Sequence, residues 1–162
     1  MTGTTYKALT VWQPWASLII EGAKPHEFRR WPAPSSMVGQ RVVIHAGARK
    51  AKFDEIAEML NRLGSEEDGT ALTADKARPL LALYATGLRE GCTAGAQLPH
   101  GCGIGSAILG KPIRCTDLYP GDERVDEDMW AWPFTDPKPF REPISCKGAQ
   151  GFWNWNPEAR LL

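Results

Sequence analysis

The sequence predicts an α+β fold in a single domain that spans residues 1–162. Two kinds of hydrophobic spacing support this class. Residues 40–46 contain three consecutive β-branched side chains, which is typical of a strand. Apolar residues in 51–63 instead recur at helical spacing, and Gly64 follows them as a stop. A chain of this length buries well over half of its unfolded surface, so one core can hold both kinds of element.

A strand and a short helix are predicted at the start of the chain. Residues 6–12 alternate enough to form the strand. The helix spans 14–21, because Pro14 suits the first helical turn and Gly22 suits the left-handed position just past a helix end. We therefore expect a two-turn helix that packs its apolar face against a core.

A charged strand follows over residues 26–31, His-Glu-Phe-Arg-Arg-Trp. Its period of two places Glu27, Arg29 and Trp31 on one face, with Lys24 at the mouth of the strand. A carboxylate beside an arginine, with an ammonium group and an indole nearby, suits a polar planar ligand such as a nucleobase. The same pattern also fits a solvated surface ion pair of little energetic value.

A loop, a helix and a further strand are predicted after the charged strand. Residues 32–39 are rich in turn formers and predict a loop. Within 73–88 a helix is expected that starts near Pro79 or is kinked there. Residues 104–117 predict one long or bent strand broken around 110–112.

The last predicted elements are a strand over 129–134 and an edge strand over 138–144 that prolines limit. A turn at Asp136-Pro137 is expected to separate them.

Composition restricts the classes of function. Lys plus Arg and Asp plus Glu both total 19, so any nucleic-acid contact must come from a local patch. The apolar runs are shorter than the roughly 20 residues that span a bilayer, and residues 1–7 lack the apolar core of a signal peptide. We therefore expect a cytoplasmic protein that does not contact a membrane.

The cysteines predict reduced, partly buried thiols, because the four of them form no CxxC pair. Cys92, His100 and Cys102 could in principle supply soft metal ligands. A structural zinc site needs four ligands in tighter pairs, so the expectation is no metal and no cofactor.

Two motifs together carry a family resemblance. Residues 13–16, Gln-Pro-Trp-Ala, precede Gly22-x-Lys24-x-x-Glu27-x-Arg29 in the order typical of the ASCH domain, the activating signal cointegrator homology family. Residues 103–109 and 147–153 resemble the central strand and the closing segment of that family. The resemblance implies a PUA-like fold, which is a small β-barrel flanked by helices.

The resemblance also implies a cleft around Lys24, Glu27 and Arg29. His45 would face this cleft, although a histidine satisfied by a backbone partner at a strand end fits equally well. The closing segment would pack against the entrance. The expected ligand-binding residues are Trp12, Gln13, Lys24, Glu27, Arg29, Trp31, His45, Lys147 and Gln150.

Three functions follow from the resemblance. The first is binding of RNA or of a modified nucleotide or nucleoside. The second is a hydrolase, because ASCH relatives include amidohydrolases of an acylated cytidine and proteins linked to ribonuclease activity. The amidohydrolase branch has a threonine nucleophile three residues after the motif lysine, where this chain has Glu27. Here Glu27 would be the general base and Lys24 an electrostatic stabiliser. The third is a protein-interaction adaptor that uses prolines and tryptophans in 130–157.

Overall fold

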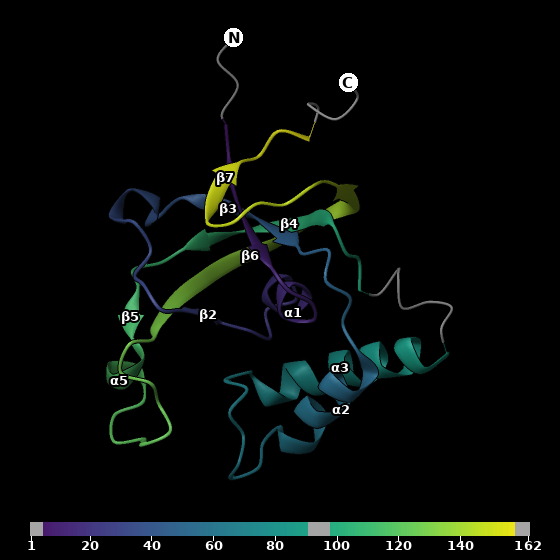
Figure 1. Ribbon diagram of the computed structural model, residues 1–162, viewed down its shortest axis with the longest axis vertical. Coiled ribbons are helices and arrows are strands. Elements are labelled where there is room, and N and C mark those ends of the chain that lie inside the picture. The colour runs from purple at the N-terminus through teal and green to yellow at the C-terminus, as the bar shows by residue number, and fades with distance from the viewer. Residues whose placement is uncertain (1–4, 91–97, 158–162) are drawn as a thin grey trace.

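A curled mixed sheet with helices packed on one side forms the molecule, as Figure 1 shows for the computed structural model, which describes residues 5–90 and 98–157. The α+β prediction is confirmed. The elements are β1 (Lys7–Val11), α1 (Trp15–Ile20), β2 (His26–Arg29), the 3₁₀ helix η1 (Ser35–Met37), β3 (Arg41–Ala46), α2 (Phe53–Arg62), α3 (Ala74–Glu90), β4 (Cys102–Leu109), β5 (Ile113–Arg114), α5 (Cys115–Leu118), β6 (Trp130–Ser145) and β7 (Phe152–Asn154).

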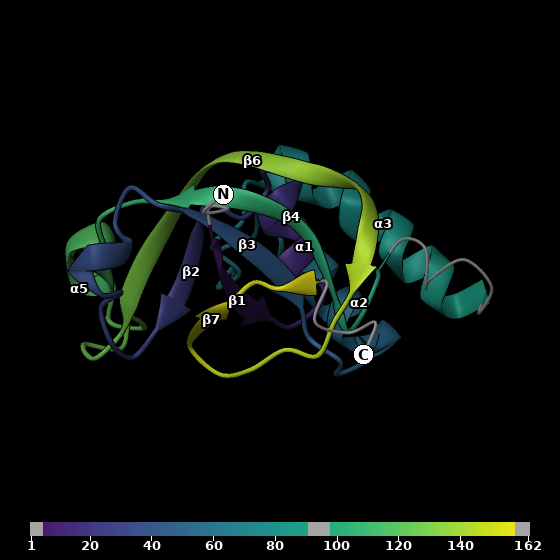
Figure 2. The same ribbon diagram turned by 90° about the horizontal axis from the view of Figure 1, so that it is seen from above.

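The sheet is a half-barrel that stays open on one side. Its strand order is β2-β6-β4-β3-β1-β7, and β5 pairs with β6. The β1–β3 pair is parallel, and the other pairs are antiparallel. Seen from above in Figure 2, the sheet curls so that β2 comes round toward β1 and β7. The curl of the sheet therefore brings β1 and β2 close enough to build a site between them.

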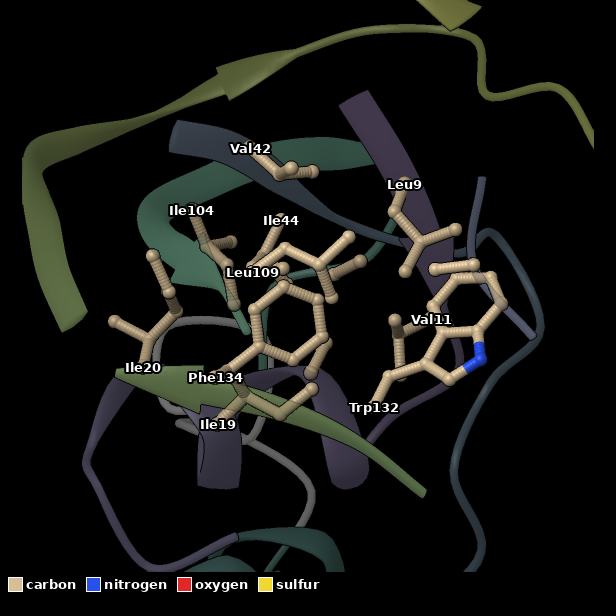
Figure 3. Close-up of a cluster of buried hydrophobic side chains, with 14 of the residues drawn as sticks. Leu9, Val11, Ile19, Ile20, Val42, Ile44, Ile104, Leu109, Trp132 and Phe134 are labelled. Atoms are coloured by element: carbon tan, nitrogen blue, oxygen red, sulfur yellow. The ribbon is translucent and has the colours of Figure 1, made fainter. Parts of the chain in front are cut away.

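Two hydrophobic clusters meet at α1. One cluster fills the concave side of the sheet, where Ile19 and Ile20 pack against strand residues such as Ile44 and Trp132 (Figure 3). The other joins α1 to α2 and α3 through Leu18. Because residues 16–20 are all buried, this short helix serves both cores rather than presenting a single apolar face.

The turn after α1 has the predicted form. Gly22 adopts a left-handed conformation with φ of 76°. The backbone N–H groups of Ala23 and Lys24 then both donate to the Leu18 carbonyl, at 2.9 and 3.0 Å. Gly22 thus ends the helix within one residue of the predicted position. Lys24 thus follows this turn and comes two residues before the start of β2.

The expected helix start near Pro79 is wrong. The helix α3 begins at Ala74 and continues through Pro79. The missing N–H of this proline leaves the carbonyl of Asp75 without its helical donor, but Asp75 is exposed, so water can take that place. The buried side chains of Leu81 and Tyr84 pack in the cluster with α2, and this packing outweighs the lost hydrogen bond.

The expected break around 110–112 is confirmed, since β4 and β5 are separate strands. The residues after 114 form the helical turn α5 instead of a continued strand. The expected turn at Asp136-Pro137 is wrong, because β6 runs through it as one strand. Asp136 has a positive φ of 47°, and the pairing with β4 shifts register there. The extra residues are therefore absorbed as a bulge.

Close packing of β4 against β6 depends on a glycine. A Cβ atom on Gly105 would lie 2.6 Å from the carbonyl oxygen of Lys138.

Cys102, Cys115 and Cys146 are buried free thiols, and Cys92 lies outside the described residues. Burial raises the pKa of the Cys102 and Cys115 thiols. Across residues 5–90 and 98–157, none of the helices is both long and apolar enough to cross a membrane.

Candidate functional site

A cleft of about 760 Å³ lies at the open side of the half-barrel. It is bounded by the end of β1, by β2 and by residues 149–151, which precede β7. The lining residues are Thr10, Val11, Trp12, Trp15, Glu27, Phe28, Arg29, Trp31, Ala149, Gln150 and Gly151. Its volume falls in the range of about 300–1,000 Å³ that is usual for small-molecule sites.

The predicted pair of Glu27 and Arg29 lies together in this cleft. Nε of Arg29 is 3.1 Å from Oε1 of Glu27, and the side chains are 22% and 12% exposed. Nη2 of Arg29 donates to the Thr10 carbonyl at 3.1 Å. One guanidinium group therefore holds the carboxylate and also spans the opening between β2 and β1. A planar fork of donors makes this possible, and a lysine ammonium would not reproduce it.

Lys24 forms a second ion pair with the carboxylate of Glu27. Its Nζ atom is 3.6 Å from Oε2 of Glu27, and its side chain is only 4% exposed. The ammonium also lies 4.9 Å from the ring centroid of Trp15 and 4.8 Å from that of Phe28. Burial lowers the pKa of Lys24, and the charge and hydrogen bond of Glu27 oppose this shift. Lys24 thus lies beneath the cleft, and Trp15 and Phe28 line the surface above it.

Two exposed indoles border the cleft. Trp12 is 60% exposed and Trp31 is 53% exposed. The guanidinium of Arg49 lies 5.0 Å from the ring centroid of Trp12. At the other rim, the indole N–H of Trp132 donates to the Trp31 carbonyl at 3.0 Å and fixes that backbone. Large exposed aromatic rings beside a polar floor are suited to stacking on a planar ligand.

Gln13 and His45 do not line this cleft, and each is only 1% exposed. The side-chain amide of Gln13 accepts from the Ser17 backbone N–H at 3.0 Å and donates to the Pro99 carbonyl at 2.9 Å. Gln13 therefore braces the start of α1. His45 instead contacts Thr10, which does line the cleft, at 3.2 Å between Nδ1 and Oγ1.

The closing segment contributes Gln150 to the cleft, whereas Lys147 is exposed and outside its lining. Sequence reasoning missed Thr10, whose carbonyl and hydroxyl both contribute to the site. It also missed the remaining lining residues, which are Val11, Trp15, Phe28, Ala149 and Gly151. A small residue or a backbone atom carries no chemical pattern in a sequence, so only its place in the fold reveals its role.

The available groups favour recognition of an uncharged polar surface. Glu27 offers acceptors, and Arg29 and Gln150 offer donors. Within the part of the chain that the structure describes, no group of three or more His, Cys, Asp or Glu side chains is arranged to hold a metal ion. The hypothetical soft ligand Cys92 lies outside that part.

Comparison with known proteins gives one family match. A family model described as "ASCH domain" matches residues 9–126, which is more than half of the chain. A crystal structure of ASCH from Zymomonas mobilis is similar, at 17% identity over 86% of this chain and 73% of that one, with a TM-score of 0.44. A serine-to-alanine mutant of the same Zymomonas mobilis protein gives 16% identity over 96% and 93%, with a TM-score of 0.47. No curated protein matches.

Proposed function

The chain belongs to the ASCH domain family, and from this membership and the cleft we propose that it binds RNA or a modified nucleotide or nucleoside. The curled half-barrel and its flanking helices agree with the PUA-like fold of that family. One observation carries the proposal. The Glu27–Arg29 ion pair lies in the same cleft as the two exposed indoles of Trp12 and Trp31.

The polar groups of the cleft define what kind of base it accepts. A carboxylate takes hydrogen bonds from an exocyclic amino group, as when an acidic side chain recognises cytosine N4. Arg29 uses Nε for Glu27 and Nη2 for Thr10, which leaves further N–H groups to donate to a base carbonyl. We therefore expect a base that carries both an amino group and a carbonyl, such as cytosine or guanine, to bind better than uracil.

Stacking supplies the remaining affinity. Contact between an aromatic side chain and a base contributes about 1–3 kcal/mol and tolerates any base identity. The formal net charge of the chain is zero, so one cleft can neutralise only a few phosphates. Binding should accordingly be moderate and should depend only weakly on salt.

Calorimetric titration tests the proposal directly. Cytidine, guanosine, uridine, their monophosphates and a short single-stranded RNA are titrated into the wild type and into Trp31→Ala. The variant should bind about 5-fold to 150-fold more weakly, which corresponds to 1–3 kcal/mol. Leu83→Ala is the matched control, because Leu83 is also largely exposed but lies on α3, outside the cleft lining. Absence of binding for every compound would refute the proposal, as would an equal loss in both variants.

A second candidate function is hydrolysis in the same cleft. The observation that favours it is the burial of Lys24 against Glu27, which orients one carboxylate oxygen while the other remains next to the cleft. Glu27 would take a proton from a water that attacks an amide or a phosphodiester, and Lys24 would be the electrostatic stabiliser. This hydrolase would act on a modified nucleoside, in the manner of an amidohydrolase, or on RNA as a ribonuclease.

A further inference from the structure

The two rims of the cleft differ in charge, and this difference bears on what the base is attached to. We propose that the bound nucleotide is part of a longer single-stranded RNA whose backbone leaves the cleft past Trp12 and runs over Lys50 and Lys52. This inference rests on the proposed function and adds the path that the RNA backbone takes. The inference distinguishes a protein that binds a polynucleotide from one that binds a free nucleoside.

The rim at Trp12 continues into a basic segment. The backbone N–H of Gly47 donates to the Val11 carbonyl at 2.9 Å, so the chain after β3 lies beside the end of β1. Arg49 then covers one face of Trp12, and its guanidinium is itself paired with Glu55. That pairing holds Arg49 in place and leaves the indole of Trp12 as a platform at the edge of the cleft.

Lys50 and Lys52 follow directly and are both exposed. The segment is fixed in the fold, because the backbone N–H of Ala51 donates to Nε2 of His100 at 3.2 Å. Phosphate contacts position a nucleic acid without reading its sequence, and lysine is suited to that role as a point charge. A base stacked at Trp12 would therefore have its neighbouring phosphates beside these two lysines.

The rim at Trp31 is unfavourable for phosphate. Arg30, directly before it, is paired with Asp126 at 3.1 Å. Asp126 belongs to segment 122–128, which contains five acidic residues and one arginine. That arginine, Arg124, is paired with Asp122 at 2.8 Å. An RNA backbone leaving on this side would meet uncompensated negative charge.

A competing path exists beyond β2. Arg114 lies 4.6 Å from the ring centroid of Trp130, and Lys111 lines the same hollow. However, Asp117 also lines this hollow. The backbone N–H of Cys115 bonds to the Met129 carbonyl at 3.0 Å, which brings the end of the acidic segment next to it. Asp117 and the adjoining acidic segment reduce the positive charge of this surface, so it fits phosphate less well than the lysine pair.

The salt dependence of binding distinguishes the two paths. Each phosphate that a single strand loses as a contact should reduce the slope of log affinity against log salt by about 0.7. A labelled single-stranded RNA of about eight nucleotides, within the site sizes of single-strand-binding folds, is titrated by fluorescence anisotropy at several salt concentrations. The proteins are the wild type, the double variant Lys50→Gln with Lys52→Gln, and the control Lys111→Gln.

The double variant should lose about 1.4 from the slope, and Lys111→Gln should leave it unchanged. Affinity for cytidine monophosphate should stay the same in all three proteins, and melting temperatures should confirm that each is folded. A slope that falls only in Lys111→Gln would overturn the inferred path. If the RNA binds no more tightly than the mononucleotide, the inference fails while the proposed function stands. If neither ligand binds the wild type, both fail together.

Discussion

Nε2 of His45 lies 2.6 Å from the carbonyl oxygen of Cys146, and Nδ1 lies 3.2 Å from the Thr10 hydroxyl. A carbonyl can only accept, so Nε2 carries a proton and donates to the Cys146 carbonyl. The indole N–H of Trp153 donates to the same hydroxyl at 3.2 Å. His45 thus ties β3 and β1 to the start of the segment whose residues 149–151 form one wall of the cleft.

Gly148→Ala should loosen this wall. An added Cβ atom would lie 2.6 Å from Oγ1 of Thr10 and 2.7 Å from Cε1 of His45. Relieving that overlap would move the segment away from β1, and overpacking of this kind costs about 1–3 kcal/mol. Urea denaturation should show lower stability, and nucleotide affinity should fall. Gly69→Ala is the control, because a Cβ there has no atom within 4 Å; equal effects in the two variants would contradict the role given to the wall.

The burial of Lys24 makes the free energy of unfolding depend on pH in the alkaline range. Burial lowers the pKa of Lys24 in the folded protein below its ordinary value of 10.5. Between the two values the unfolded chain binds the proton more strongly, so the free energy of unfolding rises with pH in that window. The wild type should therefore gain stability relative to Lys24→Met as pH is raised toward 10.5. Denaturation curves at a series of alkaline pH values measure this difference, and a difference that stays flat would disprove the assignment.

The part of the site that depends on local spacing was predictable from the sequence. The alternation in β2 placed Glu27 and Arg29 on one face, and both line the cleft. Gly22 marked the end of α1 because a left-handed residue is needed there. Both inferences use neighbours within a few residues, where backbone geometry alone decides which side chains can meet.

Contacts between distant segments were not predictable. Lys24 lies near the ring of Trp15 from α1 and the ring of Phe28 from β2, so its motif position did not reveal its burial. His45 bonds a carbonyl 101 residues away, which sets its role as a brace for the cleft wall. In β6, pairing with β4 overrides the turn tendency of Asp136-Pro137. Tertiary partners decide each of these outcomes, and one sequence does not name them.

Arg29→Lys should show that the span across the cleft needs a guanidinium. A lysine can keep one contact with Glu27, but it cannot also donate to the Thr10 carbonyl. The lost bond leaves a partly buried acceptor unsatisfied, which costs about 1–3 kcal/mol. Urea denaturation and nucleotide titration should both register the loss. Arg62→Lys, in the exposed pair with Glu58 on α2, should change stability by no more than about 0.5 kcal/mol; a similar loss there would contradict the argument.

Glu27→Gln separates the binding function from the hydrolase. The amide keeps the shape of the side chain but cannot accept a proton at neutral pH, so a hydrolase that uses Glu27 as general base should lose turnover. If the protein only binds, the substitution acts on affinity alone, through the weaker pairing with Arg29 and with a base amino group. The measurement incubates each protein with acylated cytidine and with single-stranded RNA, with and without divalent metal, and follows products by chromatography. Glu58→Gln, on the surface of α2, is the matched control and should behave as the wild type. Product formed by the wild type and undiminished in Glu27→Gln would remove this residue from the chemistry, whereas no product from the wild type would leave binding as the function of the cleft.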